Sequence, residues 1–203
     1  MMEYITLPGG YTGYEALRDA ALDPASYPSG VSLAAAFRPH IGRSVNSVLV
    51  TAFSDDADAL DAVRATLTGL PAAAGSTAER LIPVAERNLP MLAADDALYT
   101  NRWFHCRTEH EAAFEEDSLK SWDGWEADNG VNTIGLWKKP PAKGVTSFFL
   151  IARYASMAAW ANSRFTTREG EQRPEWSVRF ARRRTYLADT EVITTNCLGR
   201  ILG

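Results

Sequence analysis

Residues 145–154 read Val-Thr-Ser-Phe-Phe-Leu-Ile-Ala-Arg-Tyr, and residues 45–54, one hundred positions earlier, read Val-Asn-Ser-Val-Leu-Val-Thr-Ala-Phe-Ser. Both stretches read as apolar strands, and Val, Ser and Ala recur at the same places in them. Identities continue at this offset on both sides: Glu15 with Glu115, Asp23 with Asp123, Gly30-Val31 with Gly130-Val131, Ala59 with Ala159, Arg64 with Arg164, and Thr66 with Thr166. Self-similarity at a fixed period indicates internal repetition, and this period is too long for a solenoid. We therefore expect two copies of one small α/β unit.

The flanking patterns predict the elements of each copy. For the first copy they are a strand at 3–7, a helix at about 13–22, strands at 31–38 and 45–53, helices at about 55–68 and 76–87, and a closing strand near 89–94. For the second copy they are a strand at 99–107, a helix at about 109–127, a hairpin of 131–138 and 145–154, a helix after Ser156, a loop at 165–174, a basic helix at 175–187 and a strand at 190–198. Capping boxes indicate three of the helix starts, at Thr12/Glu15, Ser76/Glu79 and Thr108/Glu111.

The order strand-helix-strand-strand-helix-strand is typical of a ferredoxin-like unit, a four-stranded antiparallel sheet with helices on one face. The predicted fold class is α+β, with tandem ferredoxin-like units at 1–95 and 96–203 that form a barrel-type arrangement within one chain. Alternate residues of a strand project to opposite faces. The face of Ala52 and Ala152 is small and apolar, which suits contact with helices. The face of Ser47 and Ser147 suits a barrel interior that holds a small ligand.

Composition narrows the classes of partner. The net charge is −4 and the pI about 5.4, so the chain lacks the basic footprint of a nucleic-acid-binding protein. It carries neither an apolar run of membrane-spanning length nor the start of a secretory signal. Cys106 and Cys197 form no CxxC pair, which favours a reducing cytoplasm over a disulfide framework. The three histidines, His40, His105 and His110, do not have zinc-site spacing, so no metal site is expected.

The strand and helix from Tyr99 to Trp125, the hairpin from Gly130 to Tyr154 and the helix after Ser156 together resemble the dimeric α/β-barrel superfamily, in its NIPSNAP, EthD-like and antibiotic-biosynthesis-monooxygenase branches. The resemblance covers most of residues 99–198 and, more weakly, 3–94. It implies a barrel of two ferredoxin-like units, from two chains or one duplicated chain. Members of the superfamily include cofactor-free monooxygenases, haem-degrading and haem-dependent enzymes, lyases and cyclases, so the fold alone does not give the reaction.

The haem-degrading branch uses an Asn, a Trp and a His. This chain offers Asn101 and Trp137, but no His follows His110, where the histidine of that branch would lie. The departure counts against haem degradation. No cofactor is required by the sequence, and haem stays open with His105 as its reasonable interior ligand.

The strand at 99–107 carries the candidate catalytic residues. Its odd positions share one face: Tyr99, Asn101, Trp103, His105 and Arg107. If Phe104 and Cys106 face the helices, these side chains line the barrel. We hypothesise that His105 is a general acid or base on an aromatic or enolisable substrate, and that Arg107 or Arg153 stabilises the developing negative charge. The alternative is a buried, hydrogen-bonded His105 with Arg107 as a salt-bridge partner at the rim.

The chain has six tryptophans, and Trp103, Trp122, Trp125, Trp137 and Trp160 cluster in the second half. These side chains are either core residues or the walls of an aromatic pocket biased to that half. The predicted substrate contacts are Asn101, Trp103, Trp137, Ser147 and Phe149.

The helix at 175–187 is strongly basic, with Arg179, Arg182, Arg183 and Arg184. Its arginines could hold an acidic group. They could instead form a solvated face paired with acidic runs of the same chain, such as Glu109 to Asp117.

These patterns predict binding, and transformation, of a small apolar or aromatic molecule in a barrel pocket, by monooxygenase-, isomerase- or lyase-like chemistry. One alternative is a ligand-binding or oligomeric assembly module without catalysis, and another is a haem-binding enzyme. The expected partners are a small ligand and further copies of the chain in a homo-oligomer, without nucleic acid or membrane.

Overall fold

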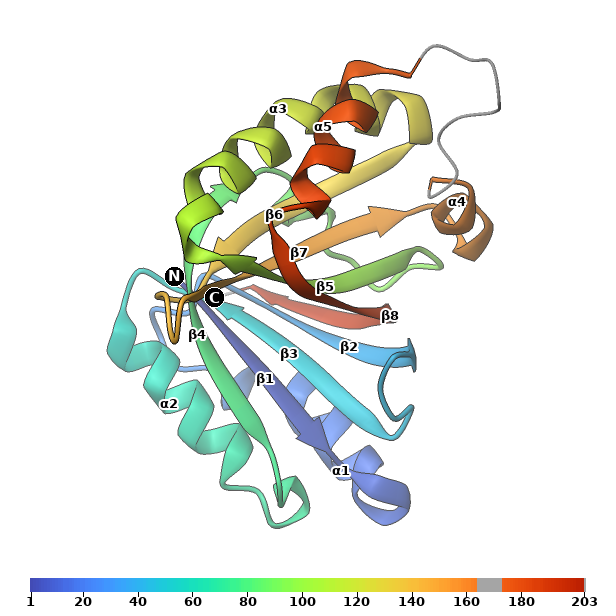
Figure 1. The fold of residues 1–203 in the computed structure, drawn as a ribbon. Helices are drawn as coiled ribbons and strands as arrows, with labels where there is room; N and C mark the ends of the chain where they lie inside the picture. The colour runs from blue at the N-terminus through green and yellow to red at the C-terminus, as the bar shows by residue number, and fades with distance from the viewer. Residues whose placement is uncertain (164–172, 203) are drawn as a thin grey trace. The chain divides into compact units, whose positions relative to one another are not determined.

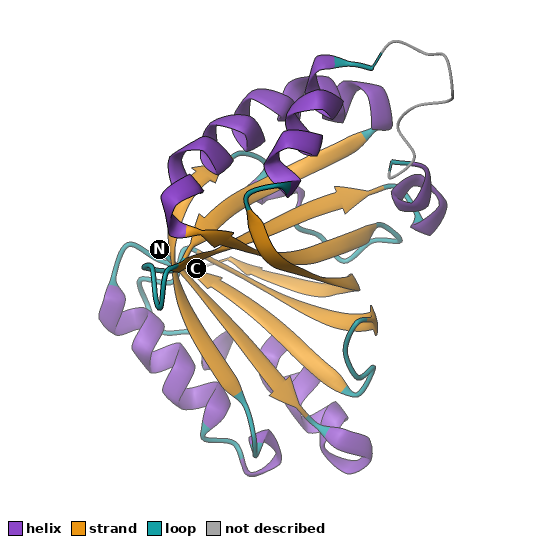
Figure 2. Cartoon of the chain, in the orientation of Figure 1, coloured by secondary structure: helices purple, strands orange, loops and turns teal. Residues whose placement is uncertain are grey.

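The computed structural model describes residues 1–163 and 173–202, and Figures 1 and 2 show their helices and strands. The strands are β1 (Met2–Pro8), β2 (Leu33–Ile41), β3 (Ser47–Phe53), β4 (Thr77–Glu86), β5 (Leu98–Arg107), β6 (Val131–Lys138), β7 (Val145–Tyr154) and β8 (Leu187–Leu202). The helices are α1 (Gly10–Leu22), α2 (Ala57–Thr68), α3 (Glu111–Asn129), α4 (Met157–Asn162) and α5 (Glu175–Arg184), with short 3-10 turns η1 (Pro24–Ser26), η2 (Pro71–Ala73), η3 (Leu89–Met91) and η4 (Thr108–His110). The loop predicted at 165–174 lies outside the described residues except for its last two positions.

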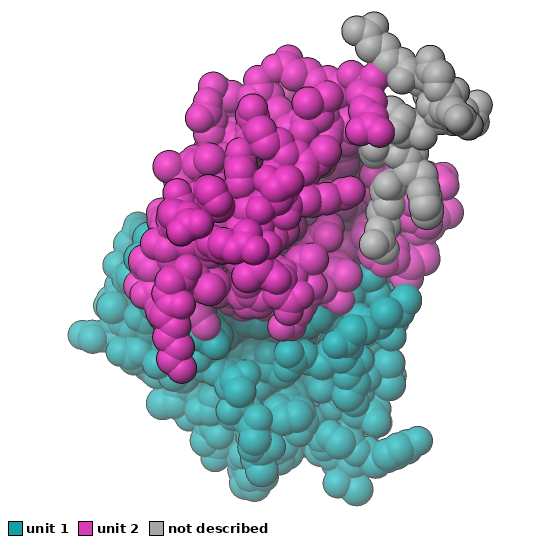
Figure 3. All heavy atoms as spheres, viewed as in Figure 1, with its two compact units in different colours: residues 1–83, 90–95, 193–203 teal, residues 84–89, 96–192 magenta. Residues whose placement is uncertain are grey.

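The chain divides into two compact units, which Figure 3 shows in different colours. Unit 1 comprises residues 1–83, 90–95 and 193–203, and unit 2 comprises residues 84–89 and 96–192. The last residues of β4 therefore belong to unit 2, and the second part of β8 belongs to unit 1. A division into separate domains at 1–95 and 96–203, and a tandem duplication as its origin, stay predictions.

In unit 1, β1 pairs antiparallel with β3 and β4, and β2 pairs antiparallel with β3 and with the last part of β8. The helices α1 and α2 pack against one face of this sheet. Their shared core contains Val48, Val50, Ala52, Leu17, Leu60, Val63 and Leu67. The prediction that the face of Ala52 packs against helices is thus confirmed.

In unit 2, β7 pairs antiparallel with β5 and β6, and its register places His105 opposite Ser147 and Trp103 opposite Phe149. The helices α3 and α5 lie side by side on one face of the sheet (Figure 1). The core between sheet and helices contains Phe104, Cys106, Phe148, Leu150, Ala152, Phe114, Trp122, Trp125 and Trp176. The expected orientation of Phe104 and Cys106, toward the helices, is confirmed.

The described strands follow the order β1-β3-β2-β8-β5-β7-β6-β4, which is that of a closed antiparallel barrel. Within it, β4-β1-β3-β2 and β8-β5-β7-β6 each repeat the fourth-first-third-second order of a ferredoxin-like unit. The predicted α+β class, with ferredoxin-like units in a barrel-type arrangement, is confirmed. None of the helices in the described ranges combines the length and hydropathy that crossing a membrane requires.

Two predicted elements of the first half were wrong. Residues 76–87 are not a helix, because Thr77 to Leu81 pair with β1 as the first part of β4. The Nε atom of Arg80 donates to Oε2 of buried Glu3 at 2.6 Å, which holds this strand in register. Partners distant in the sequence have outweighed the local signal of Ser76. Residues 89–94 are correspondingly not a strand and contain η3 instead.

Local capping predictions had mixed outcomes. The Oγ atom of Ser156 accepts a hydrogen bond from the amide of Ala159 at 3.1 Å, as expected of the residue that opens α4. The box at Thr108 does not form, because η4 precedes α3 and no side chain caps α3. Its acid, Glu111, instead binds Lys138 at 2.6 Å. That contact ties the first turn of α3 to β6.

Candidate functional site

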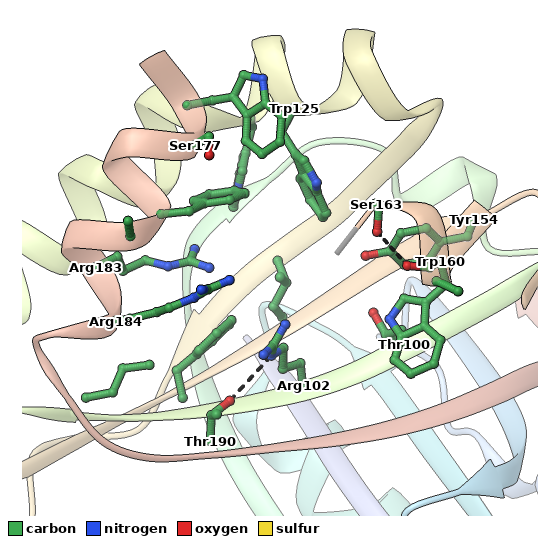
Figure 4. Close-up of a pocket in the computed structure, with 18 of the residues that line it drawn as sticks. Thr100, Arg102, Trp125, Tyr154, Trp160, Ser163, Ser177, Arg183, Arg184 and Thr190 are labelled. Atoms are coloured by element: carbon green, nitrogen blue, oxygen red, sulfur yellow. Dashed lines mark hydrogen bonds between the residues drawn. The ribbon is translucent and has the colours of Figure 1, made fainter. Parts of the chain in front are cut away.

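Unit 2 contains a cavity of about 840 Å³ between its sheet and its helices (Figure 4). Strands β5 and β7 form its floor, and α3, α4, α5 and the start of β8 form its walls. Seven aromatic side chains contribute to the lining: Phe104, Trp122, Trp125, Tyr154, Trp160, Trp176 and Phe180. A volume of this size suits a small organic molecule, and aromatic walls suit an apolar or aromatic one.

The same lining is cationic. Four arginines contribute to it, Arg102 from β5, Arg173 from the segment before α5, and Arg183 and Arg184 from α5. Among the described residues that line the cavity there is no Asp or Glu. Figure 4 shows Arg102, Arg183 and Arg184 pointing toward the same space. In a chain whose net charge is −4, this is a local reversal of charge.

Arg183 is the most unusual of the four, because the residue is only 8% exposed. Its Nη1 atom donates to Oγ of Ser118 at 3.1 Å, and its guanidinium carbon lies 4.3 Å from the ring centre of Phe180 and 4.6 Å from that of Phe104. Burial, followed by the charges of Arg102 and Arg184, lowers the pKa of Arg183 to about 9. The surroundings therefore disfavour its positive charge as they stand.

Two buried donors in the lining have no acceptor among the described residues, Nε of Arg183 and Nε1 of Trp122. Trp122 is 1% exposed, so its indole N–H has left bulk water. Buried donors without partners are costly and rare in folded proteins. Both residues line the cavity.

The position of Arg183 depends on the other arginines of α5. Arg182 donates through Nε to Oδ2 of Asp117 at 2.7 Å, and Nη1 of Arg179 lies 3.7 Å from Oδ1 of the same carboxylate. The hydrogen bond from Arg182 lowers the pKa of Asp117, so this carboxylate stays charged. Asp117 on α3 is therefore already paired with Arg182 and Arg179. Arg183, the next residue of α5, lines the cavity. The pairing of the basic helix with an acidic run of the same chain is thus confirmed for Arg179 and Arg182, and the binding of an acidic group by the helix stays a prediction.

His105 projects from β5 to the face of the sheet opposite the cavity. Its Nδ1 atom lies 2.9 Å from Oγ of Ser147, and its Nε2 atom lies 3.7 Å from Oε1 of Glu191. The ring is parallel to that of Trp103, with centres 6.4 Å apart. The imidazole is thus oriented by Ser147 on one side and faces a carboxylate on the other, while its side chain is 27% exposed.

The predicted aromatic contacts gather beside His105. The ring of Phe149 lies 4.7 Å from that of Trp103 and 6.4 Å from that of Trp137. Nε1 of Trp137 donates to Oε1 of Glu86 at 2.8 Å. A Cβ atom on Gly135 would approach the Trp137 ring to 2.6 Å, so only glycine leaves room for that indole. Trp137 is thus fixed in place.

The remaining predicted residues lie apart from this group. Arg107 is exposed, and its Nη1 atom donates to the carbonyl oxygen of Thr185 at 3.2 Å. Arg153 is half-buried in β7 opposite Tyr99, and Asn101 is fully buried in β5 opposite Ile151. The structure therefore brings together His105, Ser147, Trp103, Phe149 and Trp137, and it holds Arg107 against the chain that follows α5.

None of the eight predicted site residues lines the cavity on the helix side. The residues that line this cavity were not predicted from the sequence, because the Phe104 face of β5 was interpreted as packed core. A signal was present in Arg182, Arg183 and Arg184, since three consecutive residues of a helix span about 200° and do not share one solvated face. The described residues contain no group of His, Cys, Asp and Glu side chains able to hold a metal ion.

Comparisons with known proteins give a fold and no family. No family model matches the chain, and no curated protein does either. A proposed monooxygenase from Lactobacillus acidophilus superposes with a TM-score of 0.65 at 12% identity, over 100% of this chain and 98% of that one. An anthrone oxidase-like protein gives 0.65 at 11% identity, over 99% and 92%. A haem-bound DypB variant from Rhodococcus jostii gives 0.56 at 9% identity, over 96% and 93%. At these identities the likeness shows that the chain shares their barrel fold.

Proposed function

We propose that this protein binds a small aromatic or apolar molecule in the cavity between the sheet and helices of unit 2. The observation that carries the proposal is the cavity itself, about 840 Å³ walled by seven aromatic side chains. Aromatic side chains gathered around a space of this size are typical of ligand pockets. The fold shared with barrels that include a proposed monooxygenase and an anthrone oxidase-like protein supports a small-molecule role by analogy.

A screen of bicyclic aromatic compounds tests this proposal. Tryptophan emission and thermal unfolding report binding, because Trp122, Trp125, Trp160 and Trp176 line the cavity. Ala181→Phe fills the cavity from α5, and Val178→Phe on the same helix is the matched control, since Val178 is 53% exposed and outside the lining. We expect compounds that shift the melting temperature of the wild type and Val178→Phe but not of Ala181→Phe. A panel without any hit, or hits that survive Ala181→Phe, would contradict the proposal.

A second candidate function uses the opposite face of β5. There His105 would be a general acid or base in a monooxygenase-, isomerase- or lyase-like reaction, with Trp103, Trp137, Phe149, Asn101 and Ser147 as substrate contacts. The observation that favours it is the oriented imidazole, held at 2.9 Å by Ser147 and 3.7 Å from Glu191. Arg107 or Arg153 would stabilise negative charge on the substrate. No organic cofactor is needed for such proton transfers.

Replacement of His105 tests the second function. We expect His105→Ala to reduce conversion of a screened aromatic substrate by about 100-fold, the usual loss of a general acid or base. His40→Ala in unit 1 serves as the control. Product formation in air is followed by mass spectrometry. Unchanged turnover and affinity in His105→Ala would remove His105 from the mechanism.

Haem fits the cavity poorly. Haem iron takes an axial His, Cys, Met or Tyr. The described lining contains no His, Cys or Met, and its phenol, Tyr154, packs edge-on against Trp125 with ring centres 6.2 Å apart. No step of the proposed chemistry is therefore assigned to haem. Coordination by His105 on the other face stays a prediction, which a Soret band after incubation with haemin would support and which His105→Ala should then abolish.

A further inference from the structure

We propose that the ligand of the unit 2 cavity is a carboxylate anion with an aromatic body, and that Arg183 is the residue that recognises its charge. The inference rests on the proposed ligand-binding function and adds the chemical class of the ligand. It starts from the charge of the lining, which contains four arginines and, among the described residues, no Asp or Glu.

Converging arginines repel one another unless an anion lies between them. Arg102 is held by Thr190, whose Oγ1 atom accepts from Nε at 3.4 Å (Figure 4). That contact orients the guanidinium. Arg184 carries its charge from the end of α5 into the same space. A negatively charged group in the cavity would relieve the repulsion among all three cations.

Arg183 offers a specific donor for that group. Its Nη1 atom is used by Ser118, whereas its buried Nε–H has no acceptor among the described residues. The rings of Phe104, Phe114 and Phe180 surround the guanidinium at 4.3 to 5.3 Å and fix its plane without offering an acceptor oxygen. A planar carboxylate matches the guanidinium edge, and burial strengthens such a hydrogen bond.

The rest of the lining defines the body of the ligand. Trp125, Trp160 and Trp176 supply flat apolar surface for an aromatic ring system. The N–H of Trp122 is a second buried donor for which the described part of the chain supplies no acceptor, which suits a further oxygen atom on the ligand. The site thus pairs a cationic end, on α5 and β5, with an aromatic wall on α3, α4 and α5.

Binding of 2-naphthoate and its neutral amide, 2-naphthamide, to the full chain tests the inference by calorimetry. We expect the acid to bind at least about tenfold more tightly than the amide, and added NaCl to weaken the acid alone. Arg183→Met should remove most of the preference for the acid, and Arg184→Gln should reduce it by a smaller factor. Arg18→Gln on α1 of unit 1, whose arginine pairs with Asp19, is the control and should leave it unchanged.

The outcomes separate the two proposals. Equal affinity for acid and amide, or an acid preference that survives Arg183→Met, overturns the carboxylate inference and leaves the ligand-binding function standing. Absence of binding by both compounds, at concentrations up to their solubility, counts against both. Melting curves of each variant establish that it is folded. If Arg183→Met does not fold, Arg184→Gln still tests the preference for the acid, because Arg184 is exposed at the end of α5 and its replacement should not disturb the core.

Discussion

Arg182 donates through Nε to Oδ2 of Asp117 at 2.7 Å, and this ion pair joins α5 to α3 along one side of the unit 2 cavity. Asp117 is 1% exposed, although Arg182 reaches solvent. The hydroxyl of Tyr186 donates to the same carboxylate at 3.3 Å. One buried acid thereby sets the register of the helix that carries Arg183.

Asp117→Asn should destabilise unit 2 by about 1 to 3 kcal/mol, because it weakens several charge-assisted hydrogen bonds at a buried site. The pKa of Asp117 is lowered in the folded protein, chiefly by the hydrogen bond from Arg182. The contribution of ionised Asp117 to the free energy of unfolding is therefore complete above the ordinary carboxyl pKa of about 4. It is lost as the pH falls through the lower folded-state pKa. Urea titrations at neutral and acid pH should show the gap between wild type and variant closing below about pH 4.

The matched control is Asp123→Asn on the same helix. Asp123 is 86% exposed and pairs with Arg87 at 2.8 Å, so its loss should hardly alter the unfolding curve. An Asp117→Asn variant as stable as Asp123→Asn would show that the ion pair does not hold α5 in place.

Gly135→Ala should destabilise the protein by about 2 kcal/mol or more, because the added methyl group would lie 2.6 Å from the ring of Trp137 and 2.9 Å from the carbonyl oxygen of Ala85. Gly130→Ala provides the comparison. No atom of the described residues outside its immediate chain neighbours lies within 4 Å of its added methyl group, but its φ of 60° is left-handed, so a cost of about 1 kcal/mol is expected from the backbone alone. Chemical denaturation of both variants measures the difference. A smaller effect at Gly135 than at Gly130 would mean that the Trp137 ring moves easily.

Both cysteines should be unreactive in the folded protein. Burial raises the pKa of Cys106 and of Cys197 to about 11, and the two residues are 0% and 5% exposed. Their thiols stay protonated at neutral pH, and only the thiolate is nucleophilic. Because the folded-state values lie above the ordinary one, stability should fall as the pH rises from about 9 toward 11. Labelling with iodoacetamide at pH 8 should be slow in buffer and complete in urea. Rapid labelling in buffer would contradict the prediction that both thiols are buried and protonated.

The alternation within residues 145–154 was sufficient to predict which face of β7 packs against the helices. Phe148, Leu150 and Ala152 alternate with Ser147, Phe149 and Ile151, and the first three do face the helices. Such alternation is a property of neighbouring residues and can be read locally. The strand β4 could not be predicted locally, because its formation depends on pairing with β1 and on the contact between Arg80 and Glu3.

The cavity could not be predicted for a related reason. Its helix-facing residues, such as Phe104 and Trp125, have the composition of a packed core, and composition does not say whether core side chains meet or leave space. The burial of Arg183 depends on how α5 is aligned against α3, which Asp117 determines across 65 residues of sequence. The arginine run in the sequence was the available signal, but its direction required the tertiary structure.

Arg183→Met should stabilise the unliganded protein, or leave its stability unchanged, while it removes preference for an acidic ligand. Burial and the neighbouring arginines lower the pKa of Arg183 to about 9, so at pH 7 the folded state carries a charge that its surroundings disfavour. Because the folded-state value lies below the unfolded one, this cost is present at neutral pH and declines as the pH rises above about 9. A methionine of similar length would pack against Phe104 and Phe180 without that cost. Replacement of buried ionic groups by well-packed apolar side chains is often neutral or stabilising, by up to about 4 kcal/mol. Denaturation at pH 7 with and without 2-naphthoate measures both effects. A variant that is clearly less stable than the wild type without ligand would show that Arg183 holds the core together through Ser118, and that its role is structural.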